Sequence, residues 1–154
     1  MSVFIGTFEN KVDRKGRVSV PATFRSALQG QAFHGIIAFR SYRAPAIEAC
    51  GMDFMQRLNE SVSDMDLFSE THDDLATTIF ADSHQLALDG DGRIMMPTEL
   101  AEHAGITDRA AFVGKGPIFQ IWEPDRLDQH KDAARERARS QGLTLPLRPG
   151  GGGQ

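Results

Sequence analysis

The chain has 154 residues, which fits one domain or two very small ones, and its 40% apolar residues are enough for a small buried core. No apolar run is long enough for a membrane-spanning helix, and the single cysteine, Cys50, excludes an intramolecular disulfide and disfavours a cysteine-based zinc site. The net charge of −4 would argue against a nucleic-acid partner only if the charge were evenly distributed.

The most informative feature of the sequence is an internal repeat. The segment Asp13–Pro21 recurs 76 residues later as Asp89–Pro97, with Asp, Gly, Arg and Pro at matching positions and apolar residues opposite one another. Chance does not readily supply so many matches in one order, so we interpret the chain as two copies of one unit, called here the first copy and the second copy.

The first copy begins with a predicted strand, loop and strand. The strand of residues 8–12 leads into a loop at residues 13–17, and residues 18–20 alternate between apolar and polar side chains, as in a strand with one buried face. Asp13 can accept hydrogen bonds from backbone amides of the loop, and Gly16 can adopt a positive φ. We therefore expect both to be loop-shaping residues.

A short helix over residues 22–28, which starts after Pro21, and a strand over residues 36–39 follow in the first copy. Beyond them, Pro45 is expected to open a longer helix with an apolar stripe at helical spacing. This stripe consists of Ile47, Cys50, Phe54, Met55, Leu58 and Val62.

A further acidic helix is expected to run to about residue 80, with Thr71 as its N-cap and Asp74 three residues on. The two acidic helices, at about residues 46–80, connect the copies. Outside them, we expect the C-terminal helix at residues 125–140 to have only a thin apolar stripe.

In the second copy, Asp89 and Gly92 take the equivalent loop-shaping positions, after a predicted strand over residues 86–88. The next strand, residues 94–96, alternates less clearly, so we expect its outer face to be covered. A helix follows over residues 98–104. Two final strands are then expected on either side of a Gly-Lys-Gly-Pro hairpin signal.

Taken together, these motifs resemble a known family. The residues that carry the resemblance are the first copy with Pro21–Arg25, the loop Asp89–Arg93, and the segments Ala104–Ile106, Val113–Gly116 and Ile121–Glu123. They resemble the MraZ family of transcriptional regulators over roughly residues 4–135.

The resemblance implies an α+β fold of two tandem SpoVT–AbrB-like units, whose swapped-hairpin β-barrels interlock within one chain and are flanked by helices. With the composition and pattern of the C-terminal residues, we divide the chain into a first domain at residues 7–54, an acidic helical connector at 55–82, a second domain at 83–126, a C-terminal helix at 127–141 and a disordered tail at 142–154. The Pro- and Gly-rich composition of that tail agrees with disorder.

The resemblance also implies a function. Members of the family form rings of many subunits and bind short direct repeats upstream of their own division and cell-wall operon, which they usually repress. We therefore expect a double-stranded DNA partner and a homo-oligomer, with no cofactor, no metal, no membrane and no small-molecule substrate. Because the first residues also lack the features of a signal peptide, we expect a cytoplasmic, nucleoid-associated protein.

The distribution of charge agrees with a DNA partner. Residues 1–43 have seven Lys or Arg and two acidic residues, a net charge of +5, whereas residues 44–80 have a net charge of −7. The local field acts on a nearby polyanion more strongly than the net charge does, so the first third of the chain is where we expect a phosphate backbone to bind.

The candidate DNA-binding residues are Arg14, Lys15, Arg17 and Arg93. Arg17 and Arg93 can bind guanine or phosphate through two parallel hydrogen bonds, whereas Arg14 and Lys15 would mainly position the duplex. The alternative is that each arginine pairs with the aspartate of its own loop and only stiffens the turn. Because acidic Asp91 stands where the first loop has a lysine, we expect the second loop to bind phosphate more weakly.

A different function is also open: an antitoxin-like module whose acidic helices bind a protein partner. An enzyme is not expected, because no nucleophile, base and orienting group can be recognised. The five histidines have no spacing typical of zinc ligands, and Cys50 is expected to be a core residue.

Overall fold

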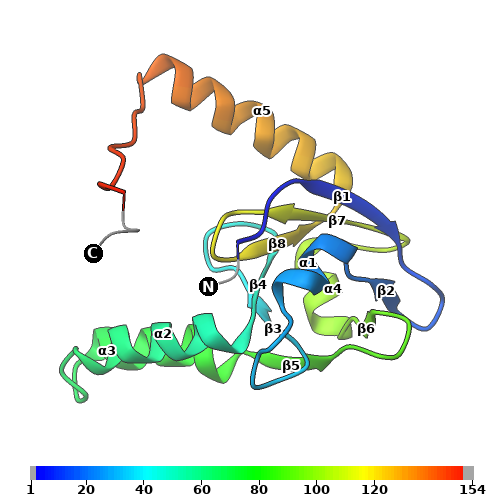
Figure 1. Cartoon of the computed structure of the whole chain (residues 1–154), viewed down its shortest axis with the longest axis horizontal. Coiled ribbons are helices and arrows are strands. Elements are labelled where there is room, and N and C mark those ends of the chain that lie inside the picture. Colours follow the sequence, from blue (N-terminus) through cyan, green and yellow to red (C-terminus); the bar gives the residue numbers. More distant parts are fainter. Residues whose placement is uncertain (1–2, 151–154) are drawn as a thin grey trace. The chain divides into compact units, whose positions relative to one another are not determined.

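The computed structural model describes residues 3–150 and shows a mixed α and β chain with antiparallel strands (Figure 1). The predicted α+β class is therefore confirmed. The chain divides into two compact units, one up to Pro124 and one from Asp125 onwards. Within residues 3–150, none of the helices is long and apolar enough to cross a membrane.

All strands of the described residues lie in the first unit. They are β1 (Thr7–Lys11), β2 (Arg17–Ser19), β3 (Gly35–Arg40), β4 (Ile47–Cys50), β5 (His84–Ala87), β6 (Arg93–Met95), β7 (Arg109–Gly114) and β8 (Phe119–Trp122). Six of them form one sheet in the order β1-β7-β8-β4-β3-β5, and β2 and β6 form a separate two-stranded ribbon.

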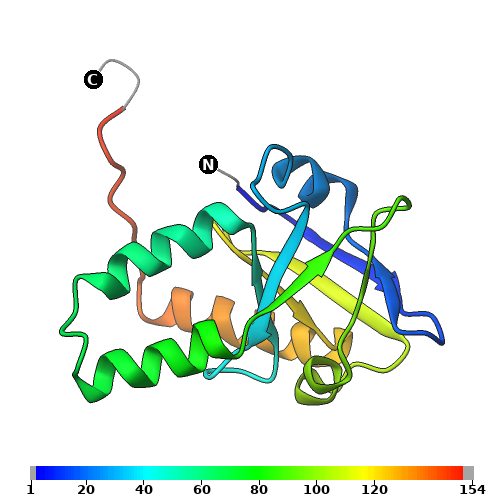
Figure 2. The ribbon, with the colours of Figure 1, turned by 90° about the horizontal axis from the view of Figure 1, so that it is seen from below.

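Helices lie between and after these strands. They are α1 (Ala22–Ala27), α2 (Met52–Ser63), α3 (Glu70–Leu75), the π-helical segment η1 (Ala76–Ala81), α4 (Thr98–Ala104) and α5 (Pro124–Ser140). In both ribbon views α2 lies beside α3 and η1, and together they project away from the sheet (Figures 1 and 2). Because η1 directly continues α3, we call α2 together with α3 and η1 the acidic helix pair.

Strand pairing joins the two copies throughout the first unit. β1 and β5 occupy equivalent places in the two copies, and each pairs with a strand of the other copy: β1 with β7, and β5 with β3. Two further pairs join equivalent strands, β2 with β6 and β4 with β8. Because the first strand of each copy has its partner in the other copy, the two copies complete one another's sheet.

The core also joins the copies, through a cluster of phenylalanine rings. The ring centroid of Phe119 lies 4.9 Å from that of Phe4, 5.0 Å from that of Phe24 and 6.2 Å from that of Phe112. All four side chains are at most 1% exposed. Aromatic rings at these separations add pairwise attraction to the burial of apolar surface, so the cluster stabilises the association of the copies.

The prediction that Pro45 opens a helix is wrong. Residues 47–50 form β4, which lies between β3 and β8 with all four residues buried, and α2 begins only at Met52. A central strand covered on both faces is largely apolar at consecutive positions, so its residues also fit a helical spacing. Cys50 is buried, as expected, but it belongs to a strand.

Two smaller expectations are also wrong. The N-cap of α3 is Ser69, whose Oγ accepts a hydrogen bond from the amide of His72 at 3.0 Å, and not Thr71. The outer face of β6 is not covered within the described residues, because Met95 is 51% exposed.

The second unit contains most of α5, whose bounds agree with the predicted helix. Residues 143–150 contain no helix or strand, and residues 151–154 of the predicted disordered tail lie outside the described residues. The domain boundaries expected at residues 54, 82, 126 and 141 stay predictions.

We predict that Phe119→Ala lowers the free energy of unfolding by about 3–5 kcal/mol, because it leaves a cavity among three other rings. Chemical denaturation monitored by circular dichroism measures this loss. Phe68→Ala is the matched control, since Phe68 is 92% exposed and its truncation should change the free energy by about 0.5 kcal/mol or less. Equal effects of the two substitutions would contradict the assigned core.

Candidate nucleic-acid interface

The loop between β1 and β2, residues 13–17, is built around one carboxylate; we call it the first loop. Oδ1 of Asp13 accepts hydrogen bonds from the amides of Lys15 at 2.9 Å and Arg17 at 2.8 Å, while Oδ2 accepts one from Nε of Arg17 at 2.7 Å. The amide of Gly16 donates to the carbonyl of Asp13 at 3.0 Å, and Gly16 has a φ of 87°. An L side chain rarely adopts this φ, so the turn requires glycine here.

The second loop, residues 89–93 between β5 and β6, repeats this construction. Oδ1 of Asp89 accepts hydrogen bonds from the amides of Asp91 at 2.8 Å and Arg93 at 3.0 Å, and Oδ2 accepts one from Nε of Arg93 at 3.1 Å. Gly92 has a φ of 76°. Arg93 also binds a second carboxylate: its Nη2 donates a hydrogen bond to Oδ2 of Asp91 at 3.2 Å.

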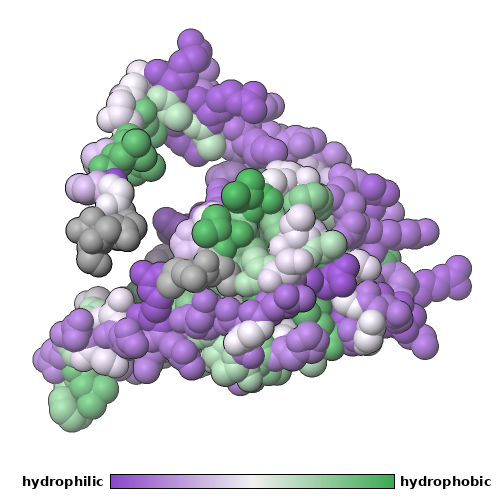
Figure 3. Space-filling view, in the orientation of Figure 1, coloured by the Kyte–Doolittle hydropathy of each residue, from purple (hydrophilic) through white to green (hydrophobic). Residues whose placement is uncertain are grey.

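Hydrogen bonds between the copies fix the position of both loops. The carbonyl of Gly16 accepts a hydrogen bond from the amide of Met96 at 2.8 Å, and the carbonyl of Gly92 accepts one from the amide of Val20 at 3.0 Å. Both loops lie at the same end of the first unit, and the acidic helix pair lies at the opposite end (Figures 1 and 2). The loop end presents a largely hydrophilic surface in the view of Figure 3.

The two loops differ in charge. The first loop has a net charge of +2 and the second loop a net charge of −1. Arg14 and Lys15 are exposed, and neither side chain has a partner within residues 3–150. The first loop therefore presents two unpaired cations beside Arg17, whereas Arg93 is held by two carboxylates.

The hydrogen bonds of Arg17 and Arg93 test the alternative in which each arginine only stiffens its own loop. Arg17 and Arg93 do pair with the aspartates of their own loops. The pairing engages only Nε of Arg17, and its two terminal nitrogens donate no hydrogen bond to any residue in the described part of the chain. Arg17 can thus stiffen its loop and still bind a ligand, and its role in DNA binding stays a prediction.

Backbone hydrogen bonds keep both aspartates ionised. The amide of Arg17 is the largest of the causes that lower the pKa of Asp13 below its usual value of 3.8, and the amide of Arg93 acts in the same way on the pKa of Asp89. Each loop therefore retains its central negative charge, and the ion pair that depends on it, to a lower pH than an aspartate without these hydrogen bonds would allow.

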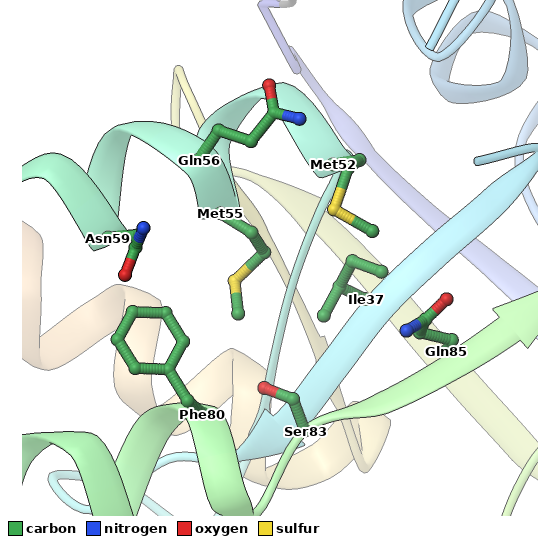
Figure 4. A pocket seen from close by; sticks show the side chains of 8 residues that line it. All are labelled: Ile37, Met52, Met55, Gln56, Asn59, Phe80, Ser83 and Gln85. Atoms are coloured by element: carbon green, nitrogen blue, oxygen red, sulfur yellow. The ribbon is translucent and has the colours of Figure 1, made fainter. Parts of the chain in front are cut away.

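Cys50 and an apolar hollow are two further features of the first unit that bear on its chemistry. Burial raises the pKa of the Cys50 thiol to about 12, so this cysteine is not a nucleophile at neutral pH. An apolar hollow of about 310 Å³ lies between α2 and η1, lined by Met52, Met55 and Phe80 among others (Figure 4). None of its lining residues is charged, so the hollow offers no ionic recognition of a ligand.

Known proteins are similar in sequence to this chain over the residues that form both loops. A family model described as "MraZ protein, putative antitoxin-like" matches residues 3–42 and 79–143. The chain is 44% identical over 145 residues to a protein of Rickettsia akari (strain Hartford) named "Transcriptional regulator MraZ". The aligned residues cover 94% of this chain and 97% of that protein. Proteins of the same name from Rickettsia bellii (strain OSU 85-389) and Rickettsia rickettsii (strain Sheila Smith) are 44% and 43% identical, with the same coverage.

We predict that the two aspartates hold their loops until the pH falls below the usual carboxyl pKa. A carboxylate whose pKa is lower in the folded chain stabilises the fold above its unfolded pKa, and this contribution is lost as the pH falls through the folded pKa. In NMR titrations, the carboxyl carbons of Asp13 and Asp89 should therefore have midpoints below 3.8, and the amides of Arg17 and Arg93 should shift with them.

The control for this titration is Asp13→Asn, which should abolish the shift of the Arg17 amide and leave that of Arg93 unchanged. Midpoints at or above 3.8 would contradict the hydrogen-bonded loops.

Proposed function

Because the chain belongs to the MraZ family of transcriptional regulators, we propose that it regulates transcription by binding double-stranded DNA through the first and second loops. Membership also confirms the prediction that the chain is not an enzyme. The observation that supports DNA binding best is the presence of two loops of the same construction at one end of the unit, the first of which has unpaired cations.

The proposed binding mode assigns different tasks to the basic residues. Arg14 and Lys15 attract the phosphate backbone and position the duplex, which contributes affinity that falls with salt. Arg17, fixed by Asp13 through Nε, directs its terminal nitrogens to a base edge or a phosphate. Because the ion pair orders Arg17 before binding, less side-chain entropy is lost when DNA binds.

The arrangement of charge supports the same binding mode. The acidic helix pair lies in the segment with a net charge of −7 and projects from the end opposite the loops. A duplex at the loop end is therefore kept away from the most acidic segment of the unit, so the overall charge of −4 is a poor guide to the local field there.

The exchange of strands between copies supports a swapped-hairpin barrel made by one chain, with the domain boundaries given above. We extend the proposal to a homo-oligomeric ring that binds direct repeats upstream of its own division and cell-wall operon and represses it, in the cytoplasm at the nucleoid.

A second candidate function is an antitoxin-like interaction with a protein. The description of the matching family supports it, as do Leu67 and Phe68, which are 64% and 92% exposed between α2 and α3. This candidate requires a partner at the acidic helix pair and no DNA at the loops, so DNA binding distinguishes the two.

We predict that Arg17→Ala weakens binding to the DNA upstream of the chain's own gene by about 1–3 kcal/mol in electrophoretic shift titrations. Arg93→Ala should weaken it less, because Asp89 and Asp91 already hold Arg93. The matched control is Arg139→Ala, which removes the same charge from an exposed position in α5 and should change binding by about 0.5 kcal/mol or less.

No shift with the wild-type chain would reject DNA binding and favour the protein-partner function. A larger loss in Arg93→Ala than in Arg17→Ala would instead show that loop charge does not decide which copy binds.

We also predict that light scattering gives a mass several times the 16.9 kDa of one chain at the concentration that shifts DNA. One loop with a few cations binds weakly, whereas loops aligned along successive repeats bind through their high effective concentration. Dilution to the monomer should then reduce DNA affinity disproportionately. A mass of 16.9 kDa together with full affinity would exclude the ring.

A further inference from the structure

An arginine from the first copy lies against the second loop. Nε of Arg25, in α1, donates a hydrogen bond to the carbonyl of Val20 at 3.1 Å, and the amide of Val20 in turn donates to the carbonyl of Gly92 at 3.0 Å. A Cβ placed on Gly92 would lie 2.7 Å from Nη1 of Arg25 and 2.8 Å from its Cδ and Cζ. The guanidinium therefore packs directly on the α-carbon of Gly92, an approach that any side chain there would block.

The charge of Arg25 is not compensated by a carboxylate. Its one hydrogen bond goes to a carbonyl, and within residues 3–150 its terminal nitrogens donate no hydrogen bond and it forms no ion pair. By contrast, Arg40, Arg109 and Arg139 each pair with an acidic residue. Arg25 is thus a half-buried, oriented cation whose remaining donors are available to a ligand.

The two copies differ at this position in a way that complements their loops. The residue equivalent to Arg25 in the second copy is Ala101, which lines a hollow beside Arg14 and Lys15 together with Glu102. The first loop therefore has its own cations, and the helix beside it, α4, has an alanine at the position of Arg25. The second loop lacks these cations, and the neighbouring helix supplies Arg25 instead.

We propose that Arg25 and the second loop together form a phosphate-binding site, in which Arg25 from the first copy replaces the cations that the second loop lacks. The bond from Nε to Val20 fixes the plane of the guanidinium, and the terminal nitrogens bind the oxygens of one backbone phosphate beside Arg93. This inference rests on the proposed DNA-binding function, and it gives each end of the β2–β6 ribbon a phosphate site.

The test is the salt dependence of binding to the double-stranded DNA upstream of the chain's own gene, measured for the wild type, Arg25→Met and Arg25→Lys. Methionine retains an unbranched side chain over Gly92 without the charge, so we expect roughly tenfold weaker binding and a plot of log affinity against log salt that is shallower by about one. Lysine should restore the salt slope, with incomplete recovery of affinity because it lacks the planar fork.

A second readout locates the site. In double-mutant cycles, Arg25→Met should be non-additive with Arg93→Ala, which removes a neighbour on the same phosphate, and additive with Arg17→Ala at the other end of the ribbon. Thermal unfolding identifies the competing structural role, in which Arg25 only supports the loop around Gly92.

Three results would overturn the inference. The first is wild-type affinity in Arg25→Met. The second is an Arg25→Met variant that loses affinity and has a lower melting temperature but keeps the wild-type salt slope. The third is additivity of Arg25→Met with Arg93→Ala. A failure of this inference alone leaves Arg17→Ala defective in binding, whereas failure of the proposed function leaves even the wild type without affinity for this DNA.

Discussion

The antiparallel pairing of β2 with β6 is the interaction on which the arrangement of the candidate site depends. This short ribbon places Arg17 opposite Met95 and Arg93 opposite Ser19, so the first loop ends at one end of the ribbon and the second loop at the other. Each loop glycine then accepts a hydrogen bond from the residue that precedes the proline of the other copy. Neither loop can change position without disturbing a strand of the other copy, and the two sites are therefore held at a fixed separation.

Duplication has preserved the shape of the loops more closely than their charge. The aspartate, the glycine with positive φ and the arginine form the same hydrogen bonds in both copies. The cations around them are distributed differently, since Arg14 and Lys15 belong to the first loop and Arg25 reaches the second from another element. A pseudo-symmetric scaffold with unequal cations can hold both loops on one duplex while the two ends contribute unequally to affinity.

Much of this could be predicted from the sequence. The repeat indicated the strand–loop–strand–helix order of both copies and the positions of Asp13 and Gly16. The repeat together with the segments that follow the second copy carried the resemblance to the family. The repeat could not show that residues 47–50 form a strand, because a buried central strand and a buried helix face have similar apolar patterns over four residues. Nor could it show Arg25 beside Gly92, because that contact depends on the exchange of elements between copies and not on spacing along the chain.

DNA binding by the two loops is tested most directly by hydrogen–deuterium exchange of the full chain with and without the DNA upstream of its own gene. We predict slower amide exchange at residues 13–17 and 89–93 when DNA is bound, with no change across the acidic helix pair at residues 52–81. Protection confined to the acidic helix pair, with both loops unchanged, would contradict DNA binding at the loops.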